Sequence, residues 1–389
     1  MSNAYVKLKD LKARDGIAGR RCAERLLTLR KQLAPLRQRR SDSSLLLATW
    51  NIRDFDSNKF GFGPRLPESF FYIAEIASCF DLIAVQEVTW DLEPLERLVS
   101  ILGREWDYIV TDTTIGKSGN DERMAFLFNR EKVWFRKVAG EVVLPNGQLI
   151  VAQKKVEATV GEATAAKVPE AAVKLKDKGL EEIGQQFART PFLATFQSGW
   201  FRFALCTVHI YYGADTGAKL KRRIAEIRGL VQFFADRQDR EVKEGKKTGR
   251  APENYILLGD FNVISPEHET MQALTEMGFV VPDEIAGDKV RKKGAHFYDQ
   301  IATRVVDKRF KVTGGGMVDL FETVFRDEDQ PLYAAHVPAK DPEEGAGAAK
   351  TPEALYRKWR TWQMSDHPPL WVEIATDFSD DYLADLAKA

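Results

Sequence analysis

Short apolar runs alternate along this chain with longer stretches in which apolar residues recur at helical spacing. Nine runs predict strands, because apolar and β-branched residues dominate them. They are Leu45–Trp50, Leu82–Gln86, Tyr108–Thr111, Met124–Phe128, Phe192–Phe196, Phe201–His209, Tyr255–Leu258, Gln300–Val306 and Leu370–Ile374. Helical spacing predicts helices over Phe70–Cys79, Leu92–Leu102 and Leu220–Gln238, and the charged segment Arg240–Arg250 predicts a loop. Strands from both halves of the chain, with helices between them, favour two packed sheets over a single parallel sheet.

The N-terminal residues 1–43 form a basic extension. They hold twelve Lys/Arg against four acidic residues, a net charge of +8, and their leucines recur at roughly helical spacing. We interpret them as an amphipathic helix docked on the chain's own domain or on a partner chain, in which case the protein self-associates. The alternative is a basic arm that follows a nucleic-acid backbone.

Residues 44–378 are predicted to form one large domain, and residues 379–389 a C-terminal tail. The domain is interrupted at about 151–185 by a segment rich in Ala, Lys, Glu and Val. Because this segment holds few large apolar side chains, we expect a surface insertion with helical structure at the edge of the domain.

Composition narrows the classes of partner and compartment. The formal net charge of the 389 residues is zero, so a site for polyanions must be a local patch or a metal centre. The cysteines Cys22, Cys79 and Cys206 lie far apart without a C-x-x-C pattern, which favours free thiols in a reducing, cytoplasmic setting. We expect neither a signal peptide nor a membrane span, because no suitable apolar run is present.

Candidate chemistry lies where the predicted strands end. The polar residues at these ends are Asn51, Glu87, His209, Asp260, Asn262, Asp366 and His367. Each alone could be a turn residue, a solvated charge or a core histidine, but all of them together are hard to explain as turns. A carboxylate such as Glu87 at the rim of a buried strand costs desolvation unless it is paired or binds a metal. Asp260 and Asn262, two residues apart, are expected to project from the same side and to address one phosphate or ion.

Five segments carry a resemblance to a known family. In chain order, Thr49–Arg53, Leu82–Val88, His209–Gly213, Leu257–Asn262 and Ser365–Pro369 resemble the endonuclease/exonuclease/phosphatase superfamily. The resemblance implies a four-layer α/β/β/α sandwich of two mostly antiparallel sheets flanked by helices. It also implies phosphoester hydrolysis, although members of the superfamily act on DNA, RNA, inositol phosphates and sphingomyelin.

Further segments resemble the deoxyribonuclease I branch. The Asn-Ile-Arg sequence that begins at Asn51 matches that branch. The resemblance implies that Glu122 supports the first catalytic histidine, that Asp299 supports the second, and that Arg189 binds phosphate. Thr89 stands where the secreted nucleases carry a minor-groove arginine, which weakens the inference to an extracellular nuclease for double-stranded DNA.

These residues predict a mechanism for phosphodiester hydrolysis. Glu87, with Asp366, is predicted to bind Mg²⁺, with Mn²⁺ or Ca²⁺ as alternatives, and Asp260 to tune that ion or hold a second one. His367 takes a proton from the attacking water and His209 protonates the leaving oxygen, although these two roles can be exchanged. The phosphoryl oxygens are expected to bind Asn51, Asn262 and Arg189.

The function predicted from the sequence is therefore a metal-dependent nuclease that hydrolyses DNA. Two alternatives keep the same fold and chemistry: a nuclease directed at RNA, and a phosphatase or phospholipase of the inositol-phosphate or sphingomyelin type. A catalytically silent scaffold is disfavoured, because all of the expected catalytic residues are present.

Overall fold

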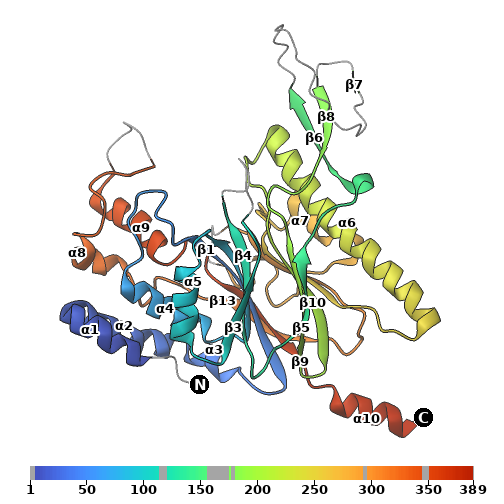
Figure 1. Ribbon diagram of the computed structural model, residues 1–389, viewed down its shortest axis with the longest axis horizontal. Helices are drawn as coiled ribbons and strands as arrows, with labels where there is room; N and C mark the ends of the chain where they lie inside the picture. The colour runs from blue at the N-terminus through green and yellow to red at the C-terminus, as the bar shows by residue number, and fades with distance from the viewer. Residues whose placement is uncertain are drawn as a thin grey trace.

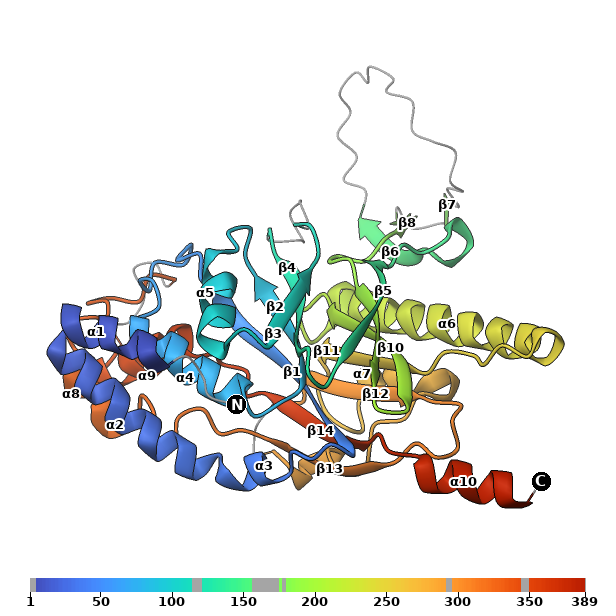
Figure 2. The same ribbon diagram turned by 60° about the horizontal axis from the view of Figure 1, so that its bottom comes forward.

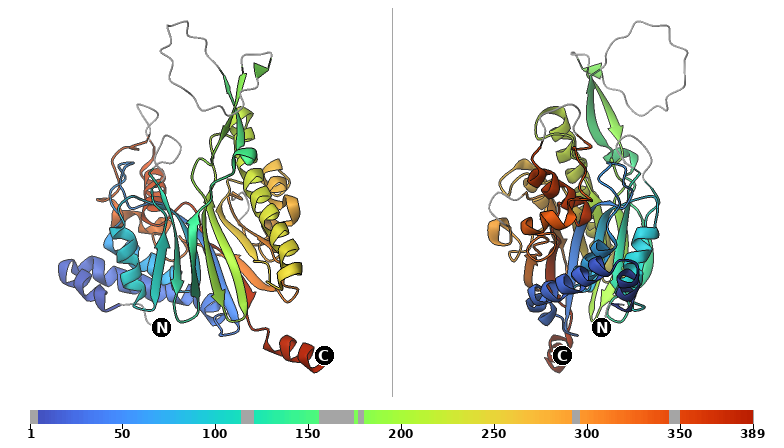
Figure 3. Two further views of the ribbon diagram at one scale, coloured as in Figure 1. Left: turned by 45° about the vertical axis from the view of Figure 1, so that its right-hand side comes forward. Right: turned by 90° about the vertical axis from the view of Figure 1, so that its left-hand side faces the viewer.

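Two packed β-sheets form the centre of the molecule (Figures 1 and 3). A computed structural model describes residues 5–113, 121–155, 175–176, 180–291, 296–343 and 350–388. The first sheet has the strand order β13-β14-β1-β2-β4-β3, and the second has the order β12-β11-β10-β9-β5. The strands of the first sheet are β1 (Ser44–Phe55), β2 (Leu82–Val88), β3 (Trp106–Val110), β4 (Arg123–Asn129), β13 (Val312–Met317) and β14 (Leu370–Ala375). Those of the second are β5 (Trp134–Glu141), β9 (Phe192–Ser198), β10 (Phe201–His209), β11 (Tyr255–Asp260) and β12 (Asp299–Arg304).

Each sheet contains a parallel pair beside antiparallel neighbours. β1 runs parallel to β2, and β10 runs parallel to β11, whereas the other strand pairs of these two sheets are antiparallel. Parallel neighbours end at the same edge of a sheet, so each parallel pair delivers two strand ends to one place.

Alternation of side chains along the strands creates three apolar layers. On β1, Leu45 and Leu47 point into the layer between the sheets, whereas Leu46 and Ala48 point to the helices outside the first sheet. Ala204 and Cys206 of β10 likewise face the helix α6 (Gly217–Thr248) outside the second sheet. With helices covering both outer faces, the predicted four-layer α/β/β/α sandwich is confirmed.

The helices divide between the two outer faces (Figure 2). Those over the first sheet are α1 (Leu8–Arg14), α2 (Gly16–Gln32), α3 (Ala34–Gln38), α4 (Pro67–Ala77), α5 (Glu93–Leu102), α8 (Gln330–Tyr333) and α9 (Pro352–Gln363). Over the second sheet lie α6 (Gly217–Thr248) and α7 (Glu269–Thr275). The expectation of a loop at Arg240–Arg250 is wrong, because α6 continues to Thr248 and ends at Gly249 in the left-handed conformation. Short 3₁₀ helices occur at Tyr5–Lys7, Asn146–Gln148, Glu276–Gly278, Gly287–Lys289 and Asp327–Asp329.

The helices of the N-terminal extension pack on the first outer face. Leu26 and Leu29 of α2 are buried in the same apolar cluster as the residues of α4. Arg21 forms an ion pair with Glu68 at 2.6 Å, and Arg40 forms one with Asp81 at 2.8 Å. Several basic side chains of the extension therefore neutralise buried carboxylates of the chain itself, so they are not available to phosphates.

Beyond the N-terminal end of α6, a small sheet stands out from the body (Figure 1). It has the order β6-β8-β7 and consists of β6 (Ile150–Lys155), β7 (Leu175–Lys176) and β8 (Leu180–Gln185). Strands therefore occupy the described parts of 151–185 where helical structure was expected, and the other residues of that segment lie outside the described ranges. Residues Ser379–Lys388 form α10, which projects from the opposite end of the molecule (Figure 3). Among the helices that the structure describes, none is both long and apolar enough to cross a membrane.

Candidate active site

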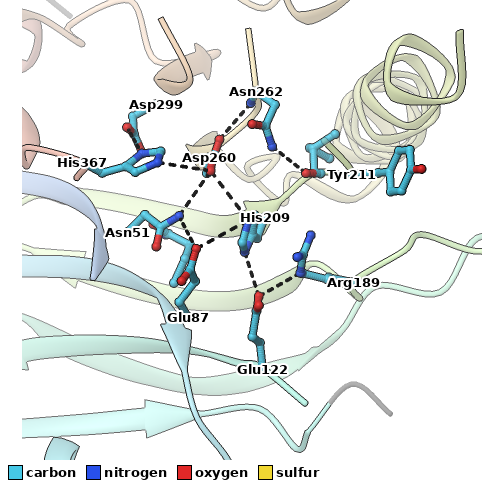
Figure 4. Close-up of polar contacts among 12 residues, drawn as sticks. Asn51, Glu87, Glu122, Arg189, His209, Tyr211, Asp260, Asn262, Asp299 and His367 are labelled. Carbon is cyan, nitrogen blue, oxygen red and sulfur yellow. Dashed lines mark hydrogen bonds and ion pairs between the residues drawn. The ribbon is translucent and has the colours of Figure 1, made fainter. Parts of the chain in front are cut away.

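Strand register places three titratable side chains in one row at the edge of the second sheet. His209 is the last residue of β10 and pairs with Asp260, the last residue of β11. Asp260 in turn pairs with Asp299, the first residue of β12. The predicted strand ends therefore meet, and Asp260 lies at the centre of the site (Figure 4).

Two histidines contact carboxylates that come from the opposite sheet. His209 of the second sheet lies 2.9 Å, Nδ1 to Oε2, from Glu122, which directly precedes β4 of the first sheet. His367 precedes β14 of the first sheet and lies 2.7 Å, Nδ1 to Oδ2, from Asp299 of the second. The two Nε2 atoms converge on the Asp260 Oδ2 atom, at 3.6 Å from His209 and 3.9 Å from His367.

The carboxylates of the two pairs titrate differently. Burial raises the pKa of Glu122, but His209 and Arg189 outweigh this effect and lower that pKa to about 2. The Arg189 Nε atom lies 2.8 Å from the Glu122 Oε2 atom. Burial raises the pKa of Asp299, although His367 opposes the rise. For His367, burial lowers the pKa, but the carboxylate of Asp299 outweighs burial and raises it well above its usual range. Negative charge near His367 thus favours its imidazolium form.

Glu87, the last residue but one of β2, has an unusual backbone conformation beside the site. Its φ angle is 60°, in the left-handed region that few non-glycine residues adopt. The carboxylate accepts hydrogen bonds from the Asn51 side-chain amide at 3.0 Å and from the Asp54 backbone N–H at 2.9 Å. Burial, followed by repulsion from Glu122, raises the pKa of Glu87, so a bound cation would offset a real electrostatic cost.

The residues around Glu87 fit a hard divalent cation. The Asn51 Oδ1 atom is buried and accepts no hydrogen bond from the part of the chain that the structure describes. It belongs to the side chain whose Nδ2 atom contacts both Glu87 and Asp260, so a carboxylate and an unsatisfied amide oxygen lie close together. Mg²⁺ prefers oxygen ligands and retains several waters, so one or two carboxylates suffice. Among the described residues, no three His, Cys, Asp or Glu side chains form a metal-binding group.

Asp366 and Asn262 lie near the site but make contacts that the sequence did not suggest. The Asp366 carboxylate faces Arg53, 3.2 Å from its Nη1 atom, and the Arg53 guanidinium stacks 3.8 Å from the centre of the Trp362 rings. Asn262 leaves the strand direction with a φ of 52° and donates its side-chain amide to the Ile210 carbonyl at 2.8 Å. The prediction that Asp260 and Asn262 project from the same side of one strand is wrong, because β11 ends at Asp260 and Asn262 lies beyond it. Instead, the Asn262 backbone N–H donates to Asp260 Oδ1 at 2.9 Å.

Sequence reasoning missed buried arginines that hold the loops of the site. Arg65 donates to the carbonyl oxygens of Arg53 and Asp54, close to the Glu87 carboxylate. Arg223 donates to carbonyls in the loops that follow His209 and Asp260. In the sequence both look like ordinary surface charges. The available signal was that Arg223 falls in the apolar stripe of a helix that continues with Ile227 and Leu230.

Comparisons with known proteins give likenesses in fold. No protein-family model and no curated protein sequence matches the chain. An endonuclease/exonuclease/phosphatase family protein from Bacteroides thetaiotaomicron is 19% identical, with a TM-score of 0.44 over 86% of this chain and 99% of that one. A mannosyl-6-phosphatase from the same species is 18% identical, with a TM-score of 0.45 over 85% and 99%. The human Nocturnin catalytic domain, solved with bound sulfate, is 13% identical, with a TM-score of 0.49 over 86% and 94%.

Proposed function

We propose that the protein is a metal-dependent phosphodiester hydrolase and that its substrate is a nucleic acid, DNA in the first place. The observation that carries this proposal is the convergence of the His209 and His367 Nε2 atoms on Asp260, with a carboxylate behind each ring. Two histidines held in this way can give and take protons on opposite sides of one phosphate. Each positioned proton transfer contributes ~10²–10⁴-fold to the rate.

The proposed chemistry divides among the residues as follows. His367 removes the proton of the attacking water, and His209 donates a proton to the leaving oxygen. Arg189, Asn51 and Asn262 bind the phosphoryl oxygens, where negative charge develops. Glu87, the Asn51 side-chain oxygen and Asp366 would hold a Mg²⁺ or Mn²⁺ ion, which when bound neutralises phosphoryl charge.

The choice of DNA rests on the resemblance of the Asn51-Ile52-Arg53 and Glu122 segments to the deoxyribonuclease I branch. The phosphatase and phospholipase alternatives share the same site. A lipid-active member would be expected to carry an exposed apolar hairpin, and the candidate for it in this chain is Tyr211–Tyr212. The Tyr212 ring lies edge-on to Tyr298, with ring centres 6.1 Å apart, and remains 44% exposed, while its carbonyl accepts a hydrogen bond from Arg223.

A substrate panel tests the proposal. Plasmid DNA, single-stranded DNA, RNA, inositol phosphates and sphingomyelin are each incubated with Mg²⁺, Mn²⁺ or Ca²⁺, and products are measured. Cleavage of DNA is expected. Cleavage of RNA alone, or of a small phosphoester or lipid alone, would replace DNA with that substrate class, and no hydrolysis at all would overturn the proposed function.

Glu87 is the proposed metal ligand whose substitution should affect metal-dependent activity most. Glu87→Gln keeps the shape of the side chain and removes its charge, so activity should fall by at least ~10²-fold, as when one electrostatic stabiliser is lost from an active site. Glu373→Gln is the matched control, because Glu373 lies on the same sheet and pairs with Arg39 far from the histidines. Full activity of Glu87→Gln, or of the wild type in excess chelator, would rule out the metal.

A further inference from the structure

The N-terminal turns of α6 bury a carboxylate directly behind the candidate active site. Glu226 is 1% exposed, although it lies on a helix with a solvated side. Its Oε1 atom accepts from the Ala188 backbone N–H at 3.3 Å and its Oε2 atom from the Tyr211 backbone N–H at 3.2 Å, while Arg222 Nε lies 3.2 Å from Oε1. Burying a carboxylate costs several kcal/mol unless hydrogen bonds and charge compensate. Connecting two loops through the buried Glu226 carboxylate therefore carries a desolvation cost that an apolar contact would not.

Both loops lead to the same histidine. Tyr211 follows His209 by two residues, so the hydrogen bond to Glu226 fixes the backbone just beyond the end of β10. Ala188 precedes Arg189, whose Nε atom contacts Glu122, and Glu122 contacts His209 Nδ1. The Glu226 carboxylate thus supports the His209 ring from its own strand and, through the Arg189 loop, from its carboxylate partner. Figure 4 shows the contacts of Arg189 with Glu122 and of Glu122 with His209.

Arg223 continues this connection to the neighbouring strand end. It is fully buried and lies three residues before Glu226, on the same face of α6. Its guanidinium donates to the carbonyls of Tyr212 at 2.5 Å, Ala214 at 2.9 Å and Asn262 at 3.0 Å. These bonds tie the loop after His209 to the loop after Asp260, where Asn262 holds a left-handed conformation.

We propose that Glu226, assisted by Arg223, is a positioning residue that fixes the His209 imidazole against Glu122 and Asp260. The inference deepens the proposed function, on which its kinetic test rests. Reacting groups that are misplaced by about 1 Å can lose ~10² in rate, so two loops held by one carboxylate matter for turnover more than for binding.

Glu226→Gln is the test variant, because the amide keeps the size of the side chain but turns an NH₂ group towards one of the two N–H donors. Glu241→Gln on the same helix is the matched control. Glu241 also accepts a backbone N–H, from Glu253 at 3.0 Å, and also contacts the arginine four residues before it. It lies fifteen residues further along α6, a rise of about 22 Å. With plasmid DNA, whose leaving oxygen needs protonation, Glu226→Gln should lower kcat by roughly 10- to 100-fold with little change in KM, and Glu241→Gln should not.

A second measurement separates positioning from mere destabilisation. In a His209→Ala background, Glu226→Gln should cause no further loss of kcat, because the group through which it acts is gone. An equal fall of kcat in both backgrounds, or wild-type kcat in a folded Glu226→Gln protein, would overturn the proposal. If Glu226→Gln does not fold, Glu226→Asp keeps the charge but cannot reach both N–H groups, and the same comparison applies.

A spectroscopic test remains valid even if the proposed function fails. The chain has five histidines, so the ring ¹⁵N signals of His209 can be assigned by substitution. Glu226→Gln should change the tautomer or the shifts of His209 and leave His268 unchanged, whereas Glu241→Gln should change neither. Unaltered His209 signals in Glu226→Gln would refute the positioning role independently of any substrate.

Discussion

The two histidine–carboxylate pairs have the same plan but different surroundings. In each pair the histidine belongs to one sheet and its carboxylate to the other, so closing the sandwich assembles both pairs together. Glu122 is shared between His209 and Arg189, whereas Asp299 contacts His367 through one oxygen and leaves its Oδ1 atom buried without a partner among the described residues. Arg291 lies near Asp299 but donates to its backbone carbonyl at 2.8 Å.

This difference shows that similar geometry need not give the same electrostatic surroundings. The Arg189 cation beside Glu122 offsets part of the negative charge of that carboxylate. No such cation contacts the Asp299 carboxylate in the described part of the chain, so its charge acts on His367, whose pKa is raised well above its usual range. The two pairs are therefore expected to respond differently when their parts are removed.

The largest effects should follow from removing the rings. His209→Ala and His367→Ala should each lower kcat by ~10²–10⁴-fold with a much smaller change in KM, because they act on bonds that change in the transition state. The double variant should lose far less than the product of the two losses, since residues that act as a unit are non-additive. Wild-type kcat in either single variant would rule out the paired-histidine mechanism.

A change of leaving group decides which ring is the acid. A nitrophenyl phosphodiester needs little protonation of its leaving oxygen, so it should restore activity to the variant that lacks the acid and not to the one that lacks the base. We expect rescue of His209→Ala. Rescue of His367→Ala instead would exchange the two roles and leave the paired mechanism intact.

Much of the fold could be predicted because a strand that is buried on both faces appears in the sequence as a continuous run of apolar residues. β2 and β11 are runs of apolar residues, and both were predicted close to their observed bounds. β13 was missed because Gly314, Gly315 and Gly316 give it no strand-like pattern. β5 was missed because most of its side chains are exposed, so no apolar alternation marks it.

The sequence indicated most of the residues of the site, but fewer of the contacts between them. Strand ends indicated His209, Asp260 and Glu87, because polar residues next to buried apolar runs are conspicuous. The contact between Arg189 and Glu122 could not be foreseen, since it depends on how a loop of the second sheet meets the first. Burial of Glu226 depends likewise on helix rotation, which local sequence does not fix.

Acid titration should reveal the Glu122 pair as a change in stability. The folded pKa of Glu122 is about 2, below the ordinary 4.5, so its contribution is full above about 4.5 and is lost as the pH falls towards 2. That shift corresponds to no more than about 3 kcal/mol. The free energy of unfolding, measured by urea titration between pH 6 and 2, should fall less steeply in Glu122→Gln than in the wild type. Asp299→Asn should not flatten this acid limb, because burial raises the pKa of Asp299. If the free energy of unfolding falls equally steeply with pH in the wild type and in Glu122→Gln, the pKa of Glu122 is not lowered and the proposed difference between the two pairs is wrong.

The smallest effects should come from neutralising the supporting carboxylates, and here the two pairs should separate. Glu122→Gln removes the carboxylate that orients the His209 ring and leaves the Arg189 cation beside that ring without its partner. Asp299→Asn leaves no side-chain cation in contact with His367, so it should cost less. We expect kcat losses of roughly 10- to 100-fold for both, the larger for Glu122→Gln. Adding Arg189→Gln to Glu122→Gln should recover part of kcat while KM rises, because the leftover cation is gone and a phosphate ligand with it. A larger loss in Asp299→Asn, or no recovery in the double variant, would show that Arg189 does not set the difference between the pairs.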